Sequence, residues 1–89
     1  EIINQMVDVI QSNENVRRID EIRTRMFGLS IYVDLEISLD ASLSLDAAHT
    51  IAEEIHDLVE ASFPDVIHCM IHVNPYRKSI ENDNNKKSK

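Results

Sequence analysis

The chain has 89 residues, of which 43% are hydrophobic and 28% are charged, a balance typical of one small globular domain. One cysteine excludes an internal disulfide and a four-cysteine zinc site, and no apolar run approaches the ~20 residues that cross a bilayer as a helix. The net charge is −7, and residues 1–76 hold fourteen of the sixteen acidic side chains but only four of the nine basic ones. A body this acidic argues against a nucleic-acid partner.

The first half of the chain predicts one helix followed by two strands. Apolar side chains recur at helical spacing over residues 1–11, and a strand with a break or bulge follows over residues 16–26. Phe27 and Gly28, the only glycine, turn the chain. Residues 29–39 then alternate apolar and polar side chains, which is typical of a strand buried on one face only.

The second half predicts a helix and a last strand. Ser44 can cap a helix that continues to Phe63 and Pro64, because a residue before proline avoids the helical conformation. Residues 66–73 predict a strand that Pro75 ends, with one face formed by Ile67, Cys69, Ile71 and Val73 and the other by His68, Met70, His72 and Asn74. Residues 77–89 are basic and polar, and we expect a disordered tail there.

The order helix, strand, strand, helix, strand predicts an α+β domain over residues 1–76. A three-stranded sheet with two helices on one face satisfies this order, as a ferredoxin-like αββαβ sandwich that lacks the usual first strand. Glutamate rather than methionine stands first, so we expect a fragment of a longer protein.

Four histidines make metal binding the chemistry to consider first. His49 and Glu53 are spaced i, i+4 on the predicted helix, whereas His68 and His72 share a strand face at roughly 13 Å and cannot hold one ion together. An ordinary surface role is favoured for His56 and His68 and stays open for His49 and His72. Cys69 is expected to pack in the core, and the chain carries no nucleophile–base pair, so we do not expect an enzyme.

Several segments stand together in one pattern: YVDLEI at residues 32–37, DASLSLDAAHTIA at 40–52, FP at 63–64 and IHVNP at 71–75. In this combination, over residues 1–76, the chain resembles the C-terminal cytoplasmic domain of cation diffusion facilitator metal transporters. The resemblance implies a metallochaperone-like αββαβ fold and a homodimer. It also implies attachment to a transmembrane domain outside this sequence, at the cytoplasmic side of the cell membrane.

The resemblance further implies a regulatory divalent-metal site at the dimer interface of an efflux transporter. Its ligand positions fall on Asp20, Glu36, His49, His72 and Asn74, with His68 and His56 less favoured. Zinc is the ion that the family implies first. Since Asp20 and Glu36 stand where well-studied zinc members have histidine, and Asn74 where they have aspartate, oxygen donors favour manganese or iron(II) or weaker zinc binding. The alternative is a ligand-free homodimeric interaction domain that has lost metal binding.

Overall fold

The computed structural model describes residues 2–77 and has the predicted order of elements. Helix α1 (Ile2–Gln11) precedes the strands β1 (Val16–Phe27) and β2 (Ser30–Asp40), and helix α2 (Leu45–Ser62) leads to β3 (Val66–Tyr76). The αββαβ prediction is confirmed. None of the helices in residues 2–77 is long and apolar enough to cross a membrane. The expected tail over residues 77–89 lies, after Arg77, outside the described residues.

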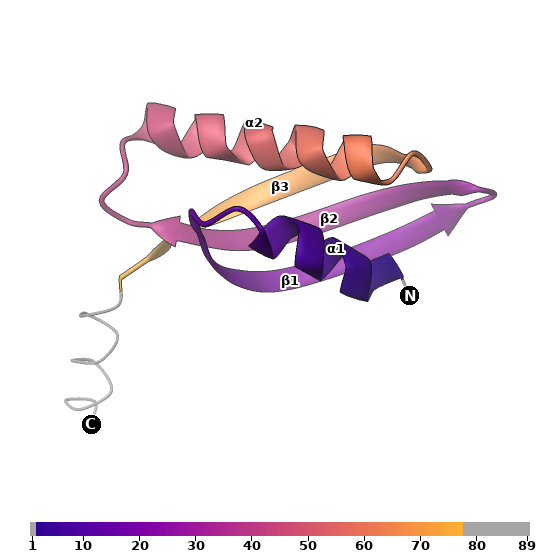
Figure 1. Cartoon of the computed structure of the whole chain (residues 1–89), viewed down its shortest axis with the longest axis horizontal. Helices are drawn as coiled ribbons and strands as arrows, with labels where there is room; N and C mark the ends of the chain where they lie inside the picture. Colours follow the sequence, from indigo (N-terminus) through magenta and orange to yellow (C-terminus); the bar gives the residue numbers. More distant parts are fainter. Residues whose placement is uncertain (1, 78–89) are drawn as a thin grey trace, which may run out of the picture.

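The sheet has the order β1-β2-β3, with β2 in the middle (Figure 1). β1 and β2 are antiparallel and joined by a tight turn in which Gly28 has φ +62°, a conformation that favours glycine. β3 runs parallel to β2, because the chain returns through α2 before it enters the sheet again.

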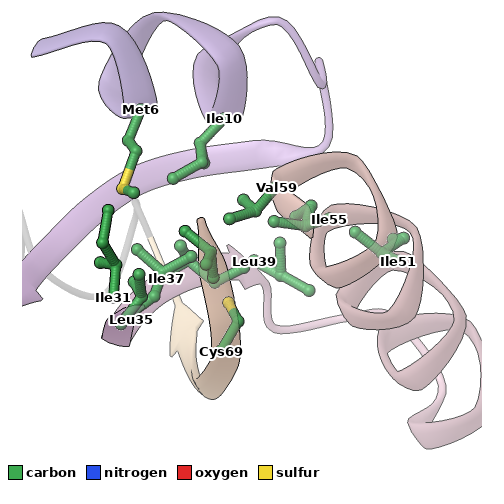
Figure 2. Close-up of a cluster of buried hydrophobic side chains, with 12 residues drawn as sticks. Met6, Ile10, Ile31, Leu35, Ile37, Leu39, Ile51, Ile55, Val59 and Cys69 are labelled. Carbon is green, nitrogen blue, oxygen red and sulfur yellow. The ribbon is translucent and has the colours of Figure 1, made fainter. Parts of the chain in front are cut away.

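Both helices pack against the same apolar face of β2. Residues 31, 33, 35, 37 and 39 of this strand are at most 5% exposed, as the alternating pattern predicts. Met6 and Ile10 of α1 and Ile51, Ile55 and Val59 of α2 reach toward them (Figure 2). The opposite face of the sheet carries no helix from the described chain, and we call it the open face.

Helix α2 begins and ends where its sequence predicts. The Ser44 hydroxyl accepts a hydrogen bond from the Ala47 backbone N–H at 3.0 Å, and this satisfies a free donor of the first turn. At the other end, the backbone N–H of the C-cap residue Phe63 donates a hydrogen bond to the Val59 carbonyl, and Pro64 follows directly after it.

Two predictions for the last strand are wrong. Pro75 does not end β3, which continues to Tyr76; β3 is an edge strand, where a missing backbone donor costs no ladder bond. Ile67 does not share the buried face with Cys69, because a register shift after the Ile31–Val66 pair inserts it as an extra residue and leaves it 56% exposed. Cys69 is buried as expected, and burial raises the pKa of its thiol to about 11.

Candidate metal centre

The central part of the open face is built by residue pairing between β2 and β3. The parallel register sets Glu36 beside His72 and Ser38 beside Asn74. Paired residues point to the same side of a sheet, and alternate residues of one strand do so too. The register therefore places three oxygen-bearing side chains and one imidazole next to one another on this face.

A bulge in β1 brings Asp20 into the same place. Ile19 pairs with Ile37 and Glu21 with Glu36, so Asp20 is an extra residue that no β2 residue opposes. Such a bulge re-aims a side chain that regular pairing would direct elsewhere. Although its backbone is exposed, only 18% of the Asp20 side-chain surface is exposed.

The Asp20 carboxylate accepts hydrogen bonds from three side chains. Arg18 Nε donates to Oδ1 at 2.7 Å, while Ser38 Oγ and Asn74 Nδ2 donate to Oδ2 at 2.7 and 2.8 Å. Burial by itself would raise the pKa of Asp20, but the hydrogen bonds from Asn74, Ser38 and Arg18 outweigh it, and the pKa lies below its ordinary value. Asp20 is therefore held as an anion at the open face.

Asn74 connects this carboxylate to a second one. Its Nδ2 also lies 3.3 Å from Glu36 Oε1, so one amide group donates to acidic side chains from two different strands. Two carboxylates that approach one another repel unless a donor or a cation stands between them. We call Asp20, Glu36, Asn74 and the neighbouring His72 the open-face cluster.

Four of the five expected ligand positions thus meet on one face. His49 does not join them within this chain: it projects from α2, on the other side of the sheet, where its Nε2 lies 3.2 Å from Glu53 Oε2. His49 and Ile71 line the same hollow between α2 and β3, so His49 faces the β3 edge of the sheet.

The two less favoured histidines have other neighbours. His68 lies at the far end of the open face, where its ring is 5.5 Å from that of Tyr32. Tyr32 in turn makes an edge-to-face contact with Phe27 at 4.9 Å, a pairing of aromatic rings that the sequence did not indicate. His56 contacts Asp57 and Glu60 on the exposed surface of α2.

The sequence did not indicate two of the residues that support Asp20, namely Ser38 and Arg18. Ser38 was expected on the wet face, yet it is fully buried under the hydrogen bond to Asp20. Arg18 forms an ion pair with Asp20 and also lies over the Tyr76 ring at 5.4 Å. The signal available for Ser38 was a small hydroxyl residue among the apolar side chains near the end of the second strand, which follows a strand with a predicted bulge.

The chemistry of the open-face cluster fits a divalent cation. Carboxylate and amide oxygens suit hard ions such as Mn²⁺, and the imidazole of His72 suits Zn²⁺ or Fe²⁺. Over residues 2–77, however, no three His, Cys, Asp or Glu side chains are grouped closely enough to hold an ion by themselves.

Comparison with known proteins gives the family context. Residues 1–76 match the family model described as cation efflux protein, cytoplasmic domain. The chain is 41% identical over 76 residues to the manganese efflux system protein MneP of Bacillus subtilis, covering 85% of this chain and 26% of MneP. It is 33% identical over 72 residues to the cation-efflux pump FieF of Cronobacter sakazakii, covering 79% of this chain and 23% of FieF.

The chain spans about a quarter of the length of these two relatives. Among solved structures, a cadmium form of a MamM CTD variant superposes with a TM-score of 0.81 at 21% identity. That match covers 85% of this chain and 94% of the MamM chain. At this level of identity the likeness concerns the fold.

Proposed function

The chain belongs to the family of cation efflux protein cytoplasmic domains, and on this premise we propose that it is the dimerising, metal-sensing domain of a divalent-cation efflux transporter. In the whole protein it would lie at the cytoplasmic side of the membrane. The transport step would belong to the part of the protein outside this sequence, and this domain would carry no catalytic step.

The observation that carries the proposal is the convergence of Asp20 and Glu36 on Asn74, with His72 alongside. A bulge aims Asp20 at this point, and three donors hold its side chain there. Two carboxylates kept close together at a partly covered surface favour a bound cation, which neutralises their repulsion.

Manganese is the ion that we propose the domain prefers. The zinc that the resemblance first implies would want more nitrogen or sulfur ligands than this cluster offers, whereas three of its four members present oxygen. MneP, a relative at 41% identity, is named for manganese efflux, which agrees with the donor set. Variants of MamM CTD have been solved in cadmium and nickel forms, so the choice of ion for this chain rests on its own donor set.

A second copy of the chain would complete the site. Because one chain offers an incomplete ligand set, the remaining donors would come from a partner protomer, and an exposed His49 at the β3 edge is available for that role. Metal would then bind the closed pair of domains more tightly than the separated pair, and this difference in affinity is what shifts the population toward the closed pair.

Thermal unfolding with and without Mn²⁺ tests the assignment of the site. A cation at about 100 times its Kd stabilises a domain by about 2.7 kcal/mol, which for this length raises Tm by roughly 10 °C or more. We expect His72→Ala to lose this response. His68→Ala is the matched control, since His68 lies on the same face of the same strand but beside Tyr32, and its response should equal that of the wild type. A full response in His72→Ala would contradict the site.

The second candidate function is a ligand-free homodimeric interaction domain. The observation that favours it is the hydrogen bonding of the cluster: Arg18, Ser38 and Asn74 already satisfy the Asp20 carboxylate without an ion. This candidate predicts the same dimer at all metal concentrations and no rise of Tm with Mn²⁺ or Zn²⁺ in the wild type.

A further inference from the structure

Asn74 occupies the place between two carboxylates that a cation would take. Its Nδ2 lies 2.8 Å from Asp20 Oδ2 and 3.3 Å from Glu36 Oε1. An ionised carboxylate only accepts hydrogen bonds, so the amide has to turn its NH₂ group toward both neighbours and its carbonyl oxygen away. In this orientation Asn74 offers a cation no ligand atom in the gap.

The Asp20 carboxylate is engaged on both oxygens. Arg18 donates to Oδ1, and Ser38 shares Oδ2 with Asn74. The Arg18 guanidinium also lies over the Tyr76 ring at 5.4 Å, a cation–π contact that keeps it in place beside Asp20. A cation that enters the gap between Asp20 and Glu36 meets the Asn74 NH₂ group, which donates to both carboxylates, and has to displace it.

Of these donors, Asn74 is the one that can exchange its role. Arg18 has donors only, and the Ser38 hydroxyl is buried beneath the carboxylate. An amide carries a donor and an acceptor on the same planar group, and a half-turn about χ2 swaps them. After such a turn, Asn74 Oδ1 would face the gap that Nδ2 now fills.

We propose that Asn74 is a latch on the metal site. In the metal-free domain its NH₂ group stands in for the cation and holds Asp20 and Glu36 together. When a cation binds, the amide turns, both hydrogen bonds break, and the carbonyl oxygen becomes a ligand. This inference rests on the metal binding proposed above. It adds that the hydrogen bonds of Asn74 lower the affinity for the cation and so raise the cation concentration at which the domain binds it.

The latch makes metal affinity and metal-free stability change in opposite directions in Asn74→Asp. The substitution removes the competing NH₂ group and adds a carboxylate, so Mn²⁺ should bind at least about tenfold more tightly, since hydrogen bonds to charged groups no longer have to break. Without metal, three carboxylates would converge with no donor between them, and Tm should fall below that of the wild type.

The experiment measures Mn²⁺ binding by calorimetry and Tm in chelator, for the wild type, Asn74→Asp and Asn13→Asp. Asn13→Asp is the matched control: it adds the same charge in the loop after α1, where the Asn13 side chain only accepts a hydrogen bond from the Asn15 N–H. A carboxylate can accept that bond equally well, so both quantities should stay near the wild-type values.

The outcomes separate the latch from the proposed function. The latch requires tighter binding together with a lower metal-free Tm in Asn74→Asp, and the alanine variant described next separates the latch from the effect of the added charge alone. Binding by the wild type that Asn74→Asp does not strengthen overturns the latch and leaves the metal-sensing function standing. Absence of binding in both proteins overturns both proposals.

A second variant covers the case in which Asn74→Asp does not fold without metal. Asn74→Ala loses the competing NH₂ group and the carbonyl ligand at once, so the latch predicts Mn²⁺ affinity no lower than that of the wild type. If Asn74 served only as a ligand, the affinity of this variant would instead fall by about tenfold, and the latch would be refuted.

Discussion

Replacing Asp20 by asparagine tests whether the hydrogen bonds that the Asp20 carboxylate accepts in the open-face cluster stabilise the domain. The side chain keeps its size but loses its charge and one of its two acceptor oxygens. Arg18 donates to one oxygen, and Ser38 and Asn74 donate to the other. Whichever way the new amide turns, its NH₂ group therefore faces at least one donor, and that donor loses its acceptor.

The expected cost is about 2 kcal/mol, because one or two hydrogen bonds to a charged acceptor are lost at a side chain that is 18% exposed. The cost should also depend on pH. Burial opposes ionisation, but the hydrogen bonds from Asn74, Ser38 and Arg18 outweigh it and hold the pKa of folded Asp20 below its ordinary value of 3.8. A carboxyl with a lowered pKa in the folded state stabilises fully above its unfolded pKa and loses that contribution as pH falls. The gap between wild type and variant should thus be full at pH 7 and shrink below about pH 4.

Urea unfolding in chelator, followed by circular dichroism at one fixed protein concentration from pH 7 to pH 3, measures this gap. Asp8→Asn is the matched control, since Asp8 is an exposed residue of α1, and it should change stability by less than about 0.5 kcal/mol. The reasoning is refuted if Asp20→Asn is as stable as the wild type at pH 7, or if the gap stays constant down to pH 3.

Three further predictions concern the fold. Leu35→Ala should destabilise the domain by about 3 kcal/mol in urea unfolding, because Leu35 is 0% exposed at the centre of the core; a loss under about 1 kcal/mol would contradict the packing. Gly28→Ala should lower the free energy of unfolding by about 1 kcal/mol. All of this loss is backbone strain, since φ is +62° and an added Cβ would meet no atom within 4 Å. Gly28→Asn should lose less stability, and equal losses in the two variants would argue against a left-handed turn. The Cys69 thiol, with its pKa raised by burial to about 11, should resist iodoacetamide at pH 8 until the protein is unfolded, as followed by mass spectrometry.

Most of the fold could be predicted from two features of the sequence: the periodic spacing of apolar residues and the residues that cap helices. The alternation of Val33, Leu35 and Ile37 identified the second strand and its buried face, and Ser44 with Pro64 marked both ends of α2. These signals are local and repeat along an element, so they can be recognised without knowledge of the tertiary structure.

The site is harder to predict because it depends on irregular pairing. A bulge was expected in the first strand, but only the register shows that Asp20 is the inserted residue and that Ser38 lies beneath it. Ile67 was misplaced for the same reason, since one inserted residue in β3 interrupts the alternation that sequence reasoning relies on.

Pro75 was misread because the sequence does not say which strand lies at the edge of the sheet. The candidate ligands, by contrast, came from a family resemblance. The convergence of Asp20 and Glu36 on Asn74 could not have been derived from spacing along the chain.

The central claim is that this domain binds a divalent cation as a dimer. Its most direct test is a calorimetric titration of the metal-free 89-residue chain with Mn²⁺ and with Zn²⁺, with light scattering on the same samples. The account predicts saturable binding, tighter for Mn²⁺ than for Zn²⁺, to a species with the mass of a dimer. Zinc binding far tighter than manganese binding would contradict the oxygen-rich site. Absence of binding of either ion to a dimer would leave a domain that pairs without sensing metal.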